Sequence, residues 1–278
     1  VLSVEADQEV SIQATQTAAT WGLDRVDQID LPLSTAYSYV SAGAGVDAYV
    51  IDTGILGTHT EFTRRMKSGY SAIGSSKNTT DWNGHGTHVA GTIGGTLYGV
   101  AKAVSLIPVR VLDCRGSGTN SGVIAGINWA IKNHTTNKAV ANLSLGGGIS
   151  STLDTAINNL IKDGVTVVVA AGNSAANACN SSPARVPGAV TVAASASNDS
   201  IASFSNIGSC VDIIAPGVAI TSAWHTSTSA TNTISGTSWQ LHTLPEQSHV
   251  DSVADFLFLG FQQNLLLGTH FSTLTQPS

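Results

Sequence analysis

Apolar runs rich in β-branched residues alternate with helix-like segments through most of this chain. The expected strands cover residues 45–51, 104–111, 139–145, 165–170, 190–193 and 211–214, and the expected helices cover 85–93, 119–132 and 151–162. Strands that are apolar throughout have both faces buried, and strands that alternate with helices form parallel sheets. We therefore predict an α/β fold of three layers, in which helices cover both faces of a mostly parallel central sheet.

The composition fits one folded domain and argues against two classes of partner. The chain has 278 residues, and its hydrophobic content of 42% is sufficient for one full core. Only 11% of the residues are charged and the net charge is -6, which argues against nucleic acid and leaves peptides or neutral polymers as substrates. No apolar run reaches the roughly 18 residues that a membrane-spanning helix needs, so we expect no contact with a membrane.

Three of the expected strands run directly into small polar loops. These loops are Asp52-Thr53-Gly54, residues 144–148 and residues 171–174. Ligands of parallel sheets bind beyond the carboxyl ends of the strands. We therefore expect the functional site where these loops meet.

Three motifs place reactive side chains at the end of a strand, at the start of a helix and in a loop, where they could take part in catalysis. Asp52 follows a buried strand, His85 and His88 stand at an expected helix start, and Ser238 ends the run Ser-Gly-Thr-Ser. Each motif has an ordinary alternative when taken alone: a turn-capping or aspartic-protease aspartate, a metal-binding histidine pair, and a polar loop. However, an aspartic protease needs two such loops, and the helical zinc signature has its histidines four residues apart with a Glu between them.

The order of these residues favours one chemistry. Asp, then His, then Ser is the chain order of the subtilisin type of catalytic triad. In that chemistry Ser238 attacks the scissile carbonyl, His85 transfers the proton, and Asp52 orients the imidazole. Asn173 follows another buried strand and would donate to the oxyanion, together with the backbone N–H of Ser238.

Seven runs, four of which contain the residues named above, match one known family in combination: VIDTGI, NGHGTHVAGTIGG, YGVAK, ANLSLGGG, AAGN, SFSNIGSCVDIIAPG and ISGTS. From Trp21 to Ser238 the chain resembles the proteinase K family of the subtilase superfamily, above all its secreted, bacterial, aqualysin-like members. The resemblance implies a subtilisin-like fold and a monomeric endopeptidase of broad specificity for proteins and peptides. It also implies a set of substrate-binding residues: Gly116, Ser117, Gly118, Ser144, Leu145 and Gly146 along the substrate backbone, and Ala170, Ala171 and Gly172 in the S1 pocket.

The resemblance assigns the first residues to a propeptide. Residues 1–13 are similar to the last strand of the family's propeptide, which inhibits the enzyme and assists its folding, and maturation is expected just before Ala14. Because the relatives are exported, we expect an extracellular protein whose export signal lies upstream of this chain.

The resemblance also assigns the cysteines. Cys179 and Cys210 match a pair that forms a disulfide in relatives, which would close a loop of about 30 residues. Cys114 matches a bonded cysteine, but Trp82 occupies the position of its partner. Cys114 is therefore expected to be a free thiol, buried and inert.

Structural calcium is the cofactor that the resemblance implies, and no organic cofactor is expected. One site would combine hard oxygen ligands: the carbonyl groups of Pro187 and Ala189 and the carboxylate of Asp199. A second site would use Asp24, Asp27 and Gln28. Ser34 and Ala36 stand where this second site needs further ligands, so we expect it to be weakened or absent.

The resemblance stops after Ser238. Residues 239–278 contain no Lys or Arg, one Ala, and four of the six Phe residues of the chain. The family continues with a buried helix that begins Met-Ala-Thr-Pro-His-Val-Ala-Gly and holds the nucleophile at its start. One permitted reverse translation of residues 239–249, preceded by a single added A, encodes Met-Ala-Thr-Pro-His-Val-Ala-Gly-Ala-Val-Ala.

We therefore predict that one base is missing between codons 238 and 239. Residues 14–238 would then be an incomplete catalytic domain, and residues 239–278 would be an out-of-frame tail. The alternative is a divergent but evolved C-terminal segment. With the base missing, this chain is expected to be poorly folded or nearly inactive, and the frame-restored protein, translated after the base is added, to be active.

Two other functions are alternatives to the protease. The chain could be a relic that binds peptides without cleaving them. It could also be a zinc hydrolase that uses His85 and His88.

Overall fold

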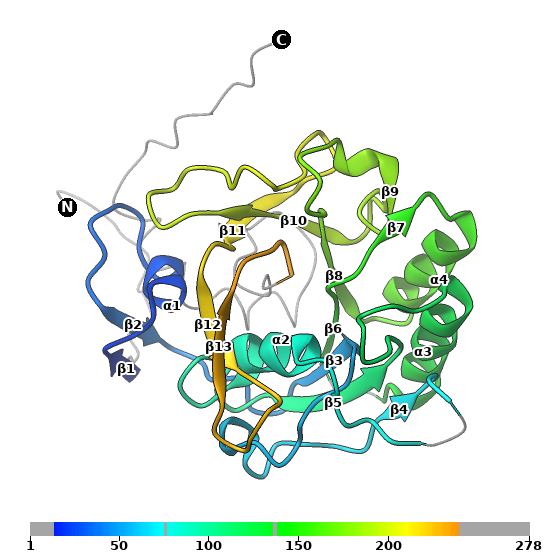
Figure 1. Ribbon diagram of the computed structural model, residues 1–278, viewed down its shortest axis with the longest axis horizontal. Helices are drawn as coiled ribbons and strands as arrows, with labels where there is room; N and C mark the ends of the chain where they lie inside the picture. The colour runs from blue at the N-terminus through cyan, green and yellow to red at the C-terminus, as the bar shows by residue number, and fades with distance from the viewer. Residues whose placement is uncertain (1–13, 75–76, 136–137, 239–278) are drawn as a thin grey trace, which may run out of the picture.

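The computed structural model describes residues 14–74, 77–135 and 138–238. The largest sheet of this part of the chain has seven strands in the spatial order β11-β10-β8-β6-β3-β5-β4, and all neighbouring strands run parallel (Figure 1). Its strands are β3 (Asp47–Asp52), β4 (Tyr70–Ser71), β5 (Ser105–Arg110), β6 (Ala139–Leu143), β8 (Thr166–Ala170), β10 (Val190–Ser195) and β11 (Ile213–Pro216). The predicted parallel sheet is confirmed.

Four α-helices lie within the described residues: α1 (Trp21–Val26), α2 (His85–Gly94), α3 (Asn120–Asn133) and α4 (Ser151–Lys162). Two of them begin at side-chain caps, because the Thr119 hydroxyl accepts from the backbone N–H of Gly122 and the Ser150 hydroxyl from that of Leu153. Such caps satisfy N–H groups that have no partner inside the helix. The 3₁₀ turns η1 (Thr60–Phe62) and η2 (Ala178–Asn180) complete the helical elements.

Alternating residues of the strands fill two separate cores. Tyr49 and Ile51 of β3 belong to the core that also contains buried side chains of α3 and α4, whereas Ala48 and Val50 belong to the core that contains Val89 of α2. Successive strand residues point to opposite faces, so the helices lie on both sides of the sheet, as Figure 1 shows. The three-layer arrangement is therefore confirmed.

Three small antiparallel sheets complete the described structure: β1 (Ala14–Thr17) with β2 (Ala36–Tyr39), β7 (Gly147–Gly148) with β9 (Ser181–Ser182), and β12 (Ile220–Ala223) with β13 (Thr231–Ile234). The hairpin of β12 and β13 leads directly to Ser238. The predicted propeptide segment, residues 1–13, and the predicted out-of-frame tail, residues 239–278, lie outside the described residues.

No helix in the described part of the chain is both long enough and apolar enough to cross a membrane.

Candidate active site

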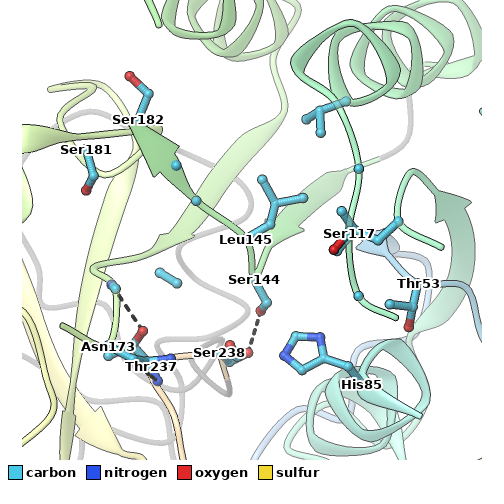
Figure 2. A pocket seen from close by; sticks show the side chains of 18 of the residues that line it. Thr53, His85, Ser117, Ser144, Leu145, Asn173, Ser181, Ser182, Thr237 and Ser238 are labelled. Carbon is cyan, nitrogen blue, oxygen red and sulfur yellow. Dashed lines mark hydrogen bonds between the residues drawn. The ribbon is translucent and has the colours of Figure 1, made fainter. Parts of the chain in front are cut away.

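The loops expected to carry the site meet at the carboxyl ends of the central strands. Strand β3 lies between β5 and β6, so the strand order reverses at this point of the sheet. Open α/β sheets bind ligands beyond the carboxyl ends of the strands at such a point. A cleft of about 800 Å³ opens there. Figure 2 shows His85, Ser238, Ser144 and Asn173 around this cleft.

The cleft contains nearly all of the side chains predicted for catalysis and substrate binding. Its lining includes Gly116, Ser117, Gly118, His85, Ser144, Leu145, Gly146, Ala170, Ala171, Gly172, Asn173 and Ser238. Asp52 lies behind His85 and is fully buried. The fold thus gathers residues from β3, α2, the loop after β5, the loops after β6 and β8, and the segment after β13.

His85 and Asp52 form a close pair. The Nδ1 atom of His85 lies 2.8 Å from Oδ1 and 2.9 Å from Oδ2 of Asp52. Burial disfavours the charged imidazolium, but the facing Asp52 carboxylate and its hydrogen bond outweigh burial, so the pKa of His85 is raised above its ordinary value. The Asp52 carboxylate therefore stabilises a protonated His85, as a general base requires after it has accepted a proton.

Asp81 joins the Asp52 loop to the start of α2. Its buried Oδ1 accepts from the Thr53 hydroxyl at 2.9 Å, and its Oδ2 accepts from the backbone N–H and hydroxyl of Thr87 at 2.9 and 2.6 Å. The Thr53 hydroxyl in turn accepts from the backbone N–H of Gly86 at 2.9 Å. Asp81 was not predicted from the sequence, because its bond to Thr53 joins segments 28 residues apart.

Gly86 allows α2 to approach the Asp52 loop closely. A Cβ atom at this position would lie 2.2 Å from the carbonyl oxygen of Gly54 and 3.2 Å from the Cβ of Asp52. A glycine inside a helix costs about 1 kcal/mol relative to alanine. At this position the cost is offset because the short distance from α2 to β3 brings His85 to Asp52.

His88 lies in the first turn of α2 but does not line the cleft. Its side chain is fully buried, and Nε2 donates to the carbonyl oxygens of Ile220 and Asn232, at 3.1 Å each. Burial lowers the pKa of His88 to about 3, so the ring is neutral. Within the described residues no group of three or more His, Cys, Asp and Glu side chains could hold a metal ion, so the zinc interpretation has no support there.

Thr237 connects Ser238 to the loop that carries Asn173. The backbone N–H of Thr237 donates to Oδ1 of Asn173 at 2.8 Å, and the Thr237 hydroxyl accepts from the backbone N–H of Gly172 at 3.1 Å. An amide side chain that accepts through Oδ1 donates through Nδ2. The Asn173 side chain is therefore fixed by its oxygen and presents its nitrogen as a donor. On the other side of the serine, the Ser144 hydroxyl donates to the carbonyl oxygen of Ser238 (Figure 2).

The cysteines agree with the sequence analysis except in one respect. Cys179 and Cys210 form a disulfide with a Cα–Cα distance of 5.4 Å, and Cys114 is free. The prediction that Cys114 is buried is wrong, because its side chain is exposed. The residue lies in a tight surface turn after β5, in which Asp113 and Ser117 are joined by a backbone hydrogen bond of 2.8 Å.

The first predicted calcium site does not form as expected. Pro187 and Ala189 precede β10, whereas Asp199 follows it, and a strand of six residues is about 20 Å long. Asp199 instead forms an ion pair with Arg25, with 2.7 Å between Nε and Oδ1. The prediction that Asp199 joins the two carbonyl groups is therefore wrong. A carboxylate that does lie at the start of β10 is that of Asp212, whose Oδ2 accepts from the backbone N–H of Thr191 at 2.7 Å.

The second predicted calcium group consists of two carboxylates in different environments. The oxygens of Asp24 accept from the backbone N–H groups of Ser34 and Thr35 at 3.1 and 2.6 Å, and the Gln28 amide also donates to this carboxylate. Asp27 accepts from the backbone N–H of Ser38 through Oδ2, but its buried Oδ1 has no hydrogen-bond partner among the described residues. Burial raises the pKa of Asp27 to about 6.

Comparison with known proteins gives the class to which this fold and site belong. The chain matches the Subtilase family over residues 43–239. It is 63% identical over 238 residues to an extracellular serine proteinase of Thermus sp. (strain Rt41A), which covers 86% of this chain and 58% of the relative. It is 56% identical over 232 residues to alkaline serine exoprotease A of Vibrio alginolyticus, which covers 84% of this chain and 43% of the relative.

A solved structure supports the same conclusion. The crystal structure of a cold adapted subtilisin-like serine proteinase is 55% identical and superposes with a TM-score of 0.78, covering 80% of this chain and 81% of the other. The chain therefore belongs to the subtilase family. It spans only 58% and 43% of the length of the Thermus and Vibrio relatives.

Proposed function

We propose that the protein is a serine endopeptidase that cleaves peptide bonds through an acyl-enzyme intermediate. The observation that carries this proposal is the His85–Asp52 pair, with distances of 2.8 and 2.9 Å, beside a cleft that Ser238 and Asn173 also line. His85 takes the proton of Ser238 as the hydroxyl attacks the carbonyl carbon, and then gives it to the leaving amine. The Asn173 amide and the backbone N–H of Ser238 stabilise the oxyanion.

The substrates we propose are extended segments of proteins and peptides, with broad side-chain preference. Two backbone segments that line the cleft, residues 116–118 and residues 144–146, would pair with the substrate as an added strand. Ala170, Ala171 and Gly172 would form walls of the pocket for the side chain before the cleaved bond. Small residues at these positions leave room for side chains of different sizes.

The remaining expectations concern maturation and location. We propose that residues 1–13 are the end of an inhibitory propeptide, and that the mature protein is a secreted monomer. The Thermus relative is named as extracellular, which supports secretion.

Calcium would bind at the start of β10, and a second, weakened site would lie beside α1. At the start of β10 the carbonyl groups of Pro187 and Ala189 and the carboxylate of Asp212 offer hard oxygen ligands, which suit Ca²⁺. Beside α1, the unpartnered Oδ1 of Asp27 fits a cation, because a buried carboxylate oxygen without a partner is costly. Bound calcium would compensate this charge and stabilise the fold, and no catalytic step depends on it.

We further propose that residues 239–278 are an out-of-frame tail. The match to the Subtilase family stops at residue 239, directly after Ser238. Val140, Val168 and Val192 belong to the core on the α2 face of the sheet, yet α2 packs mainly against β3, β5 and β12. Parallel sheets are covered across both faces. A helix after Ser238 would cover this part of the sheet and hold the serine at its first turn.

The proposed function is tested by peptide hydrolysis. The frame-restored protein is expected to cleave peptide p-nitroanilides, and its Ser238→Ala variant is expected to be inactive. Addition of zinc after treatment with a chelator is expected to give no gain in activity. Absence of cleavage by the well-folded frame-restored protein would contradict the proposal. Binding of peptides without turnover would instead identify a peptide-binding relic.

A further inference from the structure

Asn206 holds the loop after β8 at four points. Its side-chain Nδ2 donates to the carbonyl oxygen of Ala171 at 2.8 Å, and its Oδ1 accepts from the backbone N–H groups of Ser174 and Ala176 at 3.0 Å each. Its backbone N–H donates to the carbonyl oxygen of Gly172 at 2.8 Å. Asn206 itself is only 5% exposed and lies between β10 and β11. One residue from another part of the chain therefore fixes this loop on both sides of Asn173.

The fit between Asn206 and the loop leaves no free space. Gly172 has a φ of +106°, a conformation that favours glycine, and a Cβ atom there would lie 2.4 Å from Nδ2 of Asn206. The Asn206 amide thus occupies the volume that a side chain at position 172 would need. The loop conformation and the position of Asn206 depend on each other.

The same loop is bonded to the segment of the nucleophile. Gly172 donates to the Thr237 hydroxyl at 3.1 Å, and Asn173 accepts from the Thr237 backbone N–H at 2.8 Å. A shift of the loop would therefore move the Asn173 amide and also the residue before Ser238. Displacements of about 1 Å in a catalytic site reduce rates by roughly 10²-fold.

We propose that Asn206 is a positioning residue for the oxyanion hole: it acts through the loop after β8 and does not touch the substrate. This inference rests on the proposed function, in which Asn173 donates to the oxyanion. The position requires a side chain that donates one hydrogen bond and accepts two, which an amide can do and an ionised carboxylate cannot. The side chain of Gln would be one methylene too long for the volume beside Gly172.

Kinetic comparison of variants tests the catalytic part. Asn206→Ala and Asn206→Asp in the frame-restored protein are expected to lower kcat and the rate of fluorophosphonate labelling about 10- to 100-fold, with KM little changed. The Asp variant keeps the shape of the side chain and the bonds accepted from Ser174 and Ala176. It therefore provides the test if the Ala variant does not fold. An unchanged kcat in both folded variants would overturn the proposal.

Asn177 offers a matched control in the same region. Its Oδ1 accepts from the backbone N–H of Cys179 at 2.9 Å, and it lies beside Gly208, which also has a positive φ. Asn177→Ala therefore removes a comparable bond at the far end of the same connection, where the side chain caps η2 and makes no bond to the residues around Asn173. Its kcat is expected to stay close to that of the unmodified protein. An equal loss in the control and in Asn206→Ala would reduce the role of Asn206 to general loop stability and would overturn the proposal.

Amide hydrogen exchange tests the structural part of the proposal without an activity assay. In both the given chain and the frame-restored protein, Asn206→Ala is expected to accelerate exchange at Ser174 and Ala176 by about fivefold or more, because one hydrogen bond contributes about 1 kcal/mol. Exchange within β8 is expected to stay unchanged. Unchanged exchange at both amides would overturn the inference. If the frame-restored protein without the Asn206 substitution does not react with fluorophosphonate, the proposed function fails, and the exchange result still shows whether Asn206 holds the loop.

Discussion

Nδ1 of His85 lies 2.8 Å from Oδ1 of Asp52, and the carboxylate of Asp52 is fully buried. At this distance the carboxylate fixes both the orientation and the tautomer of the imidazole, so that its other nitrogen is directed to the cleft.

Replacement of this carboxylate tests its role in catalysis. Asp52→Asn in the frame-restored protein is expected to reduce kcat about 10⁴-fold, because an amide favours the wrong imidazole tautomer. Asp47→Asn is the matched control: Asp47 lies at the other end of β3 and pairs with Lys67. The control is expected to keep its kcat in the same peptide assay. Similar kcat values for the two variants would contradict the assignment of Asp52.

The pH dependence of activity follows from His85. Only neutral His85 can accept the serine proton, and its pKa is raised, so kcat/KM should fall as the pH drops through a value above 6.5. Asp52→Asn removes the main cause of the raised pKa while burial remains. The acid limb of its residual activity is therefore expected at lower pH. If kcat/KM of the unmodified protein fell only at or below pH 6.5, the result would contradict the effect of Asp52 on the pKa of His85.

Stability in acid should depend on His88. Its folded-state pKa of about 3 lies below the ordinary 6.5, so its contribution is present above pH 6.5 and is lost as the pH falls toward 3. The loss between pH 7 and pH 4 should reach up to about 3 kcal/mol from this group. His88→Gln retains a donor and does not titrate. Urea unfolding at the two pH values should show a smaller loss for His88→Gln, and an equal loss in both proteins would be inconsistent with a neutral buried His88.

The proposal that Asp212 is a calcium ligand leads to a paired test. Calcium is expected to raise the Tm of the frame-restored protein, because a ligand that binds only the folded state stabilises it. Asp212→Asn should remove most of the shift that comes from the β10 site, whereas Asp199→Asn should keep it and lose only a surface ion pair, worth about 0–1 kcal/mol. Thermal unfolding with calcium, magnesium or a chelator measures the shift. The reverse pattern for the two variants would restore Asp199 as the ligand.

The sequence predicted the sheet and the residues that line the candidate site because both depend on local patterns. Continuous apolar runs mark buried strands, and the helices expected from residues 119 and 151 begin at Asn120 and Ser151. The strand-to-loop position of Asp52 and the chain order of the reactive residues were sufficient to indicate one chemistry.

Residues that act through tertiary contacts could not be predicted in the same way. Asp81 bonds to the distant Thr53 and Asn206 to the distant loop after β8, and neither residue stands at a strand end that would mark it. Asp199 was assigned by resemblance and lies beyond the far end of β10, whereas Asp212 reaches the start of β10 only because β10 and β11 pair in parallel. Cys114 was expected to be buried because free cysteines usually are, whereas its turn is at the surface.

Fluorophosphonate labelling followed by mass spectrometry tests the central claim most directly. The account predicts one phosphonyl group on Ser238 of the frame-restored protein, none on Ser238→Ala, and little on the given chain. Absence of the label from the frame-restored protein would contradict the catalytic assignment. Equal labelling of the given chain and the frame-restored protein would contradict the proposed loss of the nucleophile helix.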